Sequence, residues 1–294
     1  MPVFKEGELL LDRYKFRRRL NISPYYQIWL VDDELLNISL ILKCLAEEKI
    51  NDPESKALLN YEWTIASNLV HRNIVRFYEF HDAPQGAFFT MQYIGSNHIG
   101  LIAGVDPSES MPVITMFADA LRYIHAKSIT HRDIKCSNIL LDSYGVPYLN
   151  DFGLSEIIGK KQKTGGGTSV FMSPQQKRGD PPQFSDDIFS LGIVMYELLL
   201  GHPPKEEKGT LVENLFESEP EFSDELKCLI CDMVSENDSL RPDIQSVIVR
   251  LNDAGFQANA APEFLLSNHD NEEIVKPISF AQLARKNKRS SKSL

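Results

Sequence analysis

Residues 131–141, HRDIKCSNILL, constrain the fold more than any other stretch of the sequence. An acid, a base and an amide, Asp133, Lys135 and Asn138, lie within six positions and directly precede a wholly apolar segment that must be buried. Thirteen residues after Asn138, Asp151 ends a second apolar stretch. We therefore expect two carboxylates and an amide to converge on one point. Mg²⁺ commonly binds to carboxylate and amide oxygens of a protein together with the phosphates of a substrate. The pattern therefore predicts phosphate chemistry.

The size and charge of the chain exclude several classes of protein. Its 294 residues, 43% of them hydrophobic, are enough for one large domain or two lobes around a real core. A net charge of −10 argues against a surface built mainly to bind nucleic acid, which needs Lys and Arg to neutralise phosphates. No apolar run approaches the ~20 residues that span a bilayer, and the first residues lack the order of a signal peptide. We expect a soluble, cytoplasmic protein with no membrane partner.

The first third of the chain alternates like a β-sheet with one helix. Three apolar or aromatic stretches between residues 12 and 45 are separated by polar turns and predict antiparallel strands. Residues 51–70 carry apolar positions at a period near 3.6 after an Asp-Pro start signal, which predicts a helix. Residues 73–82 and 86–94 predict two further strands, separated by turn residues between Ala83 and Gly86.

Helical periodicity dominates after the GSNHIG linker. Residues 111–127, 185–201 and 224–234 predict helices, the second with Ser185 as its cap and Gly201 at its end. The fold class expected is α+β, with a small sheet lobe at 14–93, a larger helical lobe at 94–255, and a ligand cleft between them. We expect residues 256–294 to form a flexible extension that is basic at its end.

The cysteines do not indicate a disulfide scaffold. There are only four, which is typical of a reducing compartment. Cys228 and Cys231 form a CxxC, but they lie in a stretch with helical apolar spacing, and no second pair follows to complete a zinc site. We therefore expect both to pack in the core and favour this over metal or redox use.

The chain resembles the eukaryotic-type protein kinase family between about residues 14 and 250. The resemblance is carried by five motifs in the family's order, HRDIKCSN, DFG, the SPQ ending at Gln175, DIFSLG from Asp187, and an RP at Arg241. A single triplet would be weak evidence, whereas five at suitable intervals are specific. The resemblance implies a bilobal kinase-like fold and ATP-dependent transfer to Ser/Thr hydroxyls of a protein substrate.

It also implies roles for the polar residues of the second lobe. Asp133 would orient the substrate hydroxyl and accept its proton, and Asn138 and Asp151 would hold the Mg²⁺ ions that bridge the phosphates of ATP. Lys135 matches the lysine of Ser/Thr-directed members, beside the transferred phosphoryl group. Asp187 matches the acid that holds the HRD turn through backbone hydrogen bonds.

The first lobe would supply the rest of the nucleotide site. Lys43 ends an apolar strand, where an unpaired buried ammonium is costly, and Glu62 on the following helix is the expected partner. The resemblance implies that this pair points Lys43 at the α and β phosphates. It further implies contacts to adenine by backbone groups of Gln92 and Ile94, with the ring enclosed by Ile28, Ile41 and Leu140.

A regulatory hypothesis follows from the loop beside Asp133. Arg132 reads as an unpaired cation that a phosphate could engage, so we expect phosphorylation of Thr164 to order the loop through Arg132. Thr168 matches the position that bonds Asp133 and Lys135.

The pattern departs from the family over the phosphates. Asn21, Ser23 and Tyr26 stand where the family has the three glycines of its loop, and Pro24 stiffens the turn. Ile41 replaces a small residue above adenine, where overpacking typically costs ~1 to 3 kcal/mol. Gln175 replaces an acid that pairs with the arginine at 241. Because these changes weaken binding while the metal and proton residues are present, the sequence favours a Ser/Thr kinase of low activity. The alternatives are a pseudokinase acting as a scaffold or allosteric partner, and an unrelated two-lobed binding protein.

Overall fold

The computed structural model describes residues 4–158, 169–207, 210–211, 216 and 222–259. Within these residues the chain divides into two compact units. Unit 1 comprises the chain up to Asn68 together with Val75–Ile94, and unit 2 comprises Leu69–Ile74 together with the chain from Gly95 onward. The short segment Leu69–Ile74 therefore packs with unit 2, although parts of unit 1 precede and follow it.

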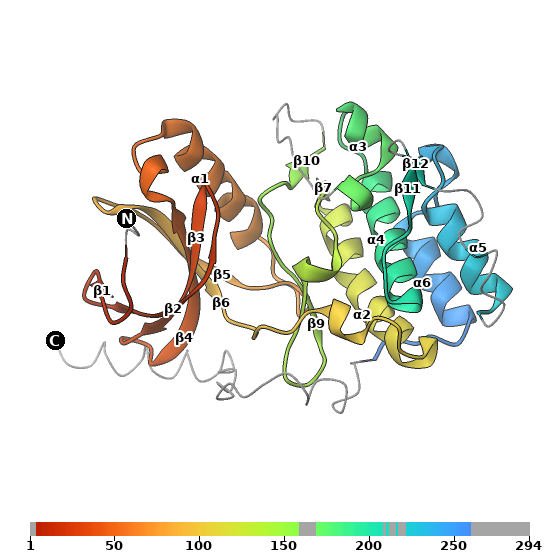
Figure 1. Ribbon diagram of the computed structural model, residues 1–294, viewed down its shortest axis with the longest axis horizontal. Coiled ribbons are helices and arrows are strands. Elements are labelled where there is room, and N and C mark those ends of the chain that lie inside the picture. Colours follow the sequence, from red (N-terminus) through yellow and green to blue (C-terminus); the bar gives the residue numbers. More distant parts are fainter. Residues whose placement is uncertain (1–3, 159–168, 208–209, 212–215, 217–221, 260–294) are drawn as a thin grey trace. The chain divides into compact units, whose positions relative to one another are not determined.

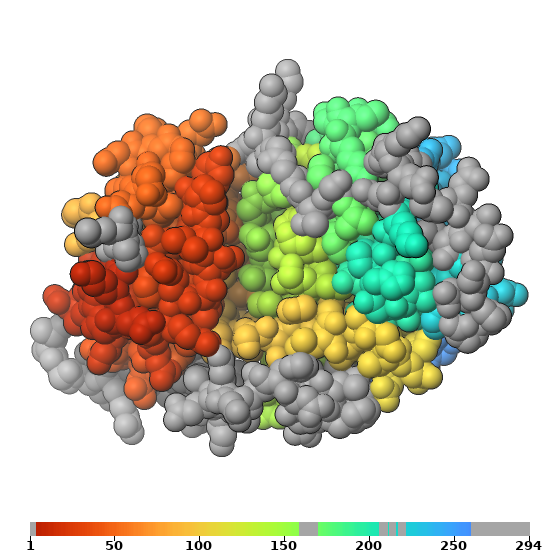
Figure 2. Space-filling view, in the orientation of Figure 1, coloured from red at the N-terminus to blue at the C-terminus, as the bar shows by residue number. Residues whose placement is uncertain are grey.

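Unit 1 is built on one antiparallel sheet of six strands in the order β1-β2-β3-β4-β6-β5. The α+β class and the sheet expected from the sequence are confirmed. In the space-filling view, strands β1 to β4 give a red surface beside the orange surface of helix α1 (Figure 2). The elements are β1 Leu9–Leu10, β2 Tyr14–Ile22, β3 Tyr26–Asp33, β4 Ile38–Leu45, α1 Pro53–Ser67, β5 Phe77–Ala83 and β6 Gly86–Gln92.

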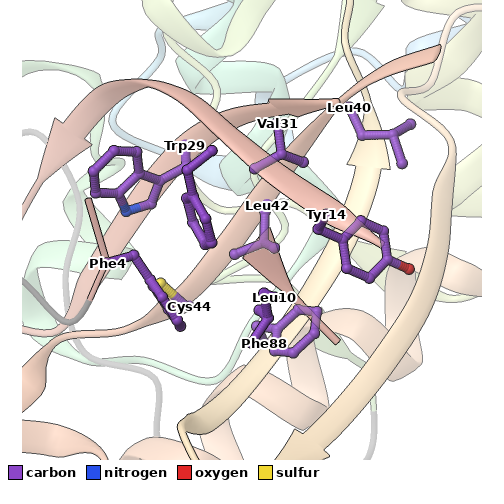
Figure 3. Packing of buried hydrophobic residues seen from close by; sticks show 10 residues of the cluster. Phe4, Leu10, Tyr14, Trp29, Val31, Leu40, Leu42, Cys44 and Phe88 are labelled. Carbon is purple, nitrogen blue, oxygen red and sulfur yellow. The ribbon is translucent and has the colours of Figure 1, made fainter. Parts of the chain in front are cut away.

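Aromatic and aliphatic side chains bury one face of this sheet. Phe16 stacks on Phe4 with ring centroids 4.4 Å apart and meets the Trp29 ring edge-on at 5.1 Å. Leu42 and Cys44 of β4 join the same cluster, as the close-up shows (Figure 3). Because side chains alternate along a strand, Lys43 between them points to the opposite face.

Helix α1 covers that opposite face. It begins where the sequence predicts, with Asp52 as its cap and Pro53 in the first turn, where proline's missing N–H costs nothing. Leu59, Ile65 and Ala66 form its buried stripe. Glu62 lies on the same stripe and is 3% exposed, so its carboxylate must be paired.

Unit 2 is mainly helical, with short two-stranded pairs (Figure 1). Helices α2 and α4 form its centre, where α2 packs against α6 and α4, and α4 packs against α5. A methyl group on Gly192 of α4 would lie 2.7 Å from Val234, so this glycine lets the chain after α5 approach closely. The elements are α2 Pro107–Ala126, β7 Ile129–Thr130, β8 Ile139–Leu141, β9 Pro147–Leu149, β10 Glu156–Ile157, α3 Pro174–Arg178, α4 Phe184–Leu200, β11 Glu206–Glu207, β12 Thr210–Leu211, α5 Asp224–Met233 and α6 Ile244–Asp253.

Three local expectations were wrong. Ser185 does not cap α4; the helix begins one residue earlier after Gln183, whose backbone N–H donates to Asp186 at 3.1 Å. Cys228 and Cys231 are exposed and not in the core, because the stripe of α5 is formed by the apolar residues between and around them. Helix α2 begins at Pro107, four residues before the expected start, because Asp106 caps it by accepting from the Ser108 N–H at 2.8 Å. The end of α4 at Gly201, with φ of 77°, is as predicted.

Candidate active site

The 131–138 segment lies between β7 and β8 and gathers its three polar groups around one carboxylate. Lys135 Nζ donates to Asp133 Oδ2 at 2.8 Å, and Asn138 Nδ2 donates to the same oxygen at 2.9 Å. Asn138 Nδ2 also donates to the Asp133 carbonyl at 2.8 Å. Every hydrogen bond that the described residues make to this carboxylate reaches Oδ2. The arrangement therefore fixes the carboxylate through one oxygen and leaves Oδ1 as the oxygen that could accept a proton.

The β8–β9 hairpin brings Asn138 beside the DFG motif. Ile139 pairs with Leu149 at this end of the hairpin, and the Asn150 N–H donates to the Asn138 carbonyl at 3.0 Å. Asp151 comes next, with φ of 63°, a left-handed conformation that non-glycine residues adopt at some cost in strain. Thus the segments carrying Asp133, Asn138 and Asp151 meet within unit 2.

The oxygen atoms that Asn138 and Asp151 carry are suitable ligands for a hard cation. The Asn138 amide directs its N–H groups at Asp133, which orients the amide oxygen away from that carboxylate. An amide oxygen and a carboxylate on adjoining backbone are the kind of set that Mg²⁺ shares with phosphate ligands. Within the described residues no group of three or more His, Cys, Asp or Glu side chains could hold a metal by itself. The amide oxygen of Asn138 and the carboxylate of Asp151 are oxygen ligands that fit Mg²⁺ held jointly with phosphate.

Asp187 of α4 holds the 131–138 segment in place. Its Oδ2 accepts from the backbone N–H of His131 at 2.9 Å, and its Oδ1 accepts from that of Arg132 at 2.7 Å. The ring of His125 contacts Oδ2 at 2.8 Å. Complete burial alone would raise the pKa of Asp187, but the hydrogen bond and charge of His125, with smaller effects from His131 and Arg132, lower it below its usual value. The anchoring role expected for Asp187 is thus present in the structure.

Arg132 is not the unpaired cation that the sequence suggested. Its Nη1 donates to Glu156 Oε1 of β10, and the two side chains are only 9% and 3% exposed. The Arg132 carbonyl also accepts from Gln176 Nε2 at 2.7 Å. β10 pairs with β7, which places Glu156 directly opposite Thr130 and within reach of the following loop. An acid from the chain itself therefore occupies the place that we had expected a phosphate to take; Thr164 and Thr168 lie outside the described residues.

Unit 1 contains the expected ion pair. Lys43 Nζ donates to both carboxylate oxygens of Glu62 at 2.8 Å, and the side chains are 8% and 3% exposed. Strand β4 and helix α1 thus fix the direction of the ammonium. Ile28 is the register partner of Lys43 on β3. The Tyr26 ring lies over the ammonium, a contact that the strand pattern alone does not predict.

The remaining expected site residues are divided between the units. In unit 1, Ile41 of β4 is buried opposite Met91, and Ile94 is the last residue of this unit that the structure describes. The Gln92 N–H donates to the carbonyl of Arg76, just before β5, at 2.8 Å, so this donor is engaged within unit 1. In unit 2, Leu140 lies in β8 opposite Tyr148.

Gln175 preserves the contact with Arg241 expected at this position. Arg241 Nη2 donates to Gln175 Oε1 at 2.8 Å. The Gln175 amide uses its other end as well, because Nε2 donates to the Glu236 carbonyl at 2.8 Å. An acid could not make this second bond, which gives a physical reason for the amide here.

Among the described residues, no helix combines the length and apolar character needed to cross a membrane. The protein kinase domain family matches residues 32–250 of the chain. The serine/threonine-protein kinase PrkC of Bacillus subtilis is 29% identical over 206 residues, which cover 67% of this chain and 32% of that protein. An Aurora kinase of Yarrowia lipolytica is 30% identical over 205 residues, covering 68% of this chain and 55% of the relative.

Aurora kinase A-A of Xenopus laevis is 28% identical over 256 residues, which cover 83% of this chain and 63% of that protein. The chain thus spans between about a third and just under two thirds of the length of these relatives. The matched region contains both the Lys43–Glu62 pair and the residues Asp133, Asn138 and Asp151. On this match and this geometry, the chain belongs to the protein kinase domain family.

Proposed function

We propose that the chain catalyses ATP-dependent phosphoryl transfer to Ser or Thr hydroxyls of a protein substrate. The observation that carries the proposal is the Asp133 carboxylate, which Lys135 and Asn138 hold through Oδ2 at 2.8 and 2.9 Å. A base fixed through one oxygen offers the other to a hydroxyl in a constant direction, which is what general-base catalysis requires. Family membership and the names of the relatives support the enzyme over the pseudokinase alternative.

In this proposal Asp133 Oδ1 accepts the hydrogen bond, and then the proton, of the substrate hydroxyl. Lys135, already bonded to the other oxygen, lies where it could neutralise charge on the transferred group. The Asn138 amide oxygen and the Asp151 carboxylate would hold Mg²⁺. When bound, Mg²⁺ would neutralise charge on the phosphate oxygens of ATP.

The unit 1 residues would bind the nucleotide. Lys43, directed by Glu62, would contact the phosphates, and its two hydrogen bonds at 2.8 Å support that fixed direction. The hydrophobic residues expected around adenine are Ile28, Ile41 and Leu140. The backbone contacts expected are those of Gln92 and Ile94, and for Gln92 this leaves the carbonyl, because its N–H donates to Arg76. We further propose residues 14–255 as the functional domain and 256–294 as an extension to it.

The test measures transfer of labelled phosphate from ATP with Mg²⁺ to peptides containing Ser or Thr. Asp133→Asn preserves size but cannot accept the proton, so we expect transfer to fall by about 10² to 10⁴. Asp180→Asn removes an exposed carboxylate that pairs with Arg178 on the surface and should leave transfer unchanged. Binding of MgATP by the unmodified chain without transfer to any peptide would overturn the proposal in favour of the pseudokinase. Equal transfer by Asp133→Asn would overturn the role of Asp133.

A further inference from the structure

The turn between β2 and β3 is shaped by side chains. Ser23 Oγ accepts from the Tyr26 N–H at 2.9 Å and from the Tyr25 N–H at 3.3 Å. The Ser23 N–H donates to the Tyr26 carbonyl at 2.8 Å, which closes the turn. Pro24 restricts φ inside it. A serine hydroxyl and a proline therefore set the backbone path of this turn, which in a glycine-rich turn depends on the conformational freedom of glycine.

The turn is also tied to the neighbouring strand. The Ala46 N–H, just after β4, donates to the Tyr25 carbonyl at 2.8 Å. Tyr26 pairs with Leu45, and Ile28 pairs with Lys43, in the β3–β4 register. Tyr26 and Lys43 are consequently diagonal neighbours on one face of the sheet, which is within reach for an aromatic ring and a long side chain.

The Tyr26 ring lies over the Lys43 ammonium. Lys43 Nζ is 4.9 Å from the centre of this ring and 6.0 Å from that of Phe89, both within the range of cation–π attraction. The carboxylate of Glu62 binds the same ammonium through two hydrogen bonds. Lys43 therefore already has an aromatic face and an anion as neighbours within unit 1.

Tyr25 provides a contrast within the same turn. Its ring lies 5.4 Å from Lys49 Nζ, and the residue is 53% exposed. The two adjacent tyrosines thus engage different lysines, and only Tyr26 engages the lysine that the proposed function assigns to phosphate. A change at Tyr25 alters the same turn without touching Lys43.

We propose that Tyr26 sets the ligand preference of this site by competing with phosphate oxygens for the Lys43 ammonium. The inference rests on the proposed contact between Lys43 and the phosphates. A nucleoside triphosphate gains its full contact with Lys43 only when the ring moves aside, whereas a nucleoside without phosphates does not require that movement. The chain therefore discriminates less between ATP and adenosine than it would with a small residue at position 26.

The test is equilibrium titration of the full chain with MgATP and, separately, with adenosine. The strength of a cation–π contact corresponds to about threefold to thirtyfold in an equilibrium constant, so Tyr26→Gly should bind MgATP tighter by about that factor. Its affinity for adenosine should change by less than about twofold. Tyr26→Phe, which keeps the ring and loses the hydroxyl, and Tyr25→Gly should both bind MgATP like the unmodified chain.

Thermal unfolding of each variant accompanies the titrations. If Tyr26→Gly does not fold, Tyr26→Leu decides the question, because it removes the π face and keeps a side chain suited to a strand; it too should bind MgATP more tightly. Unchanged or weaker MgATP binding by folded Tyr26→Gly or Tyr26→Leu, or an equal gain in their affinity for adenosine, overturns this inference. If the unmodified chain still binds MgATP and transfers phosphate, the proposed function stands. Failure of every protein to bind either ligand overturns the proposed function together with this inference.

Discussion

Arg132 and Glu156 form a buried ion pair that joins the 131–138 segment to β10. The backbone of Arg132 is held at the same time by Asp187 and Gln176. Arg132 adopts a φ of 64°, which is unfavourable for a non-glycine residue, so these contacts maintain a strained residue directly before Asp133. The pair supplies from within the chain the negative charge that a phosphorylated loop was expected to bring.

Removing the acid of this pair should destabilise the protein strongly. Glu156→Gln leaves a buried guanidinium without its counter-charge, and such changes cost about 3 to 5 kcal/mol in the free energy of unfolding. Urea unfolding monitored by circular dichroism measures this. Asp180→Asn breaks the exposed pair with Arg178, so its cost should be below about 1 kcal/mol after solvent screening. Equal costs for the two variants would contradict the burial of the Arg132–Glu156 pair.

The adjacent residues Asp186 and Asp187 should show opposite dependence on pH. The pKa of Asp187 is lowered in the folded state, despite its burial, by His125 and the backbone N–H of Arg132. Its stabilising contribution is therefore present above the unfolded pKa near 3.8 and lost as the pH falls through the lower folded value. Asp187→Asn should be about 3 kcal/mol less stable at pH 7, since it loses several charge-assisted hydrogen bonds, and this deficit should shrink below pH ~4.

Asp186 is the matched comparison. Burial raises its pKa, against opposing hydrogen bonds from Ser173 and the Gln183 N–H, so protonation of Asp186 favours the folded state. The unmodified chain should therefore gain stability relative to Asp186→Asn as the pH falls through the raised folded pKa. The free energy of unfolding, measured across pH 3 to 7 for both variants and the unmodified chain, distinguishes the two residues. The same pH dependence for both variants would refute the opposite pKa shifts of Asp186 and Asp187.

Replacing Gln175 with the acid that the family pattern has at this position should not stabilise this chain. Gln175→Glu keeps an acceptor for Arg241 but removes the donor to the Glu236 carbonyl, and it places a carboxylate oxygen against that carbonyl. Losing this hydrogen bond in a largely buried place outweighs the added charge assistance, and we expect a loss of about 1 to 2 kcal/mol. Chemical denaturation would measure it, and a gain in stability would show that the contact with Glu236 is unimportant.

The four cysteines should divide into two pairs by reactivity. Cys228 and Cys231 are exposed, whereas Cys44 and Cys136 are buried. Burial raises the pKa of Cys44 to about 12, and burial together with the Glu197 carboxylate raises that of Cys136 further. Because the thiolate is the reactive form, a thiol reagent at pH 8 should modify the two exposed cysteines and leave the other two until denaturation. Cys231 should react more slowly than Cys228, because partial burial and the neighbouring Cys228 and Asp232 raise its pKa. Peptide mapping identifies them, and rapid labelling of Cys136 in the folded chain would contradict its contact with Glu197.

The sequence predicts best the features that depend on local pattern. The strands of unit 1 and the Asp-Pro start of α1 follow from alternation and capping residues within a few positions of each other. A buried strand lysine requires an acid, and the following helix offers Glu54 and Glu62. The choice of Glu62 came from the family resemblance, which places the helix glutamate at this interval before His71. The hydrogen bonds of Asp187 with the backbone of residues 131 and 132 were predicted from the motif resemblance.

The remaining features depend on contacts between distant segments. Glu156 meets Arg132 only because β7 and β10, each two residues long, pair with one another, and strands this short leave little pattern in the sequence. The exposure of Cys228 and Cys231 depends on which face of α5 meets the core. Four stronger apolar residues decide that face and place both cysteines on the other side. Ser185 has the chemistry of a cap, but the helix already begins at Phe184, so Ser185 lies inside it.

The path of the backbone limits how this protein can be dissected. Leu69–Ile74 packs in unit 2, where the Asn73 amide donates to the Pro147 carbonyl and the Asn73 carbonyl accepts from the Leu149 N–H, each at 2.8 Å. A recombinant fragment truncated after Ile94 would contain the whole six-stranded sheet. It would also contain Leu69–Ile74, but without the Pro147 carbonyl and Leu149 N–H that form hydrogen bonds with Asn73. No single proteolytic cut between secondary-structure elements can therefore release either half with all of its own packing intact.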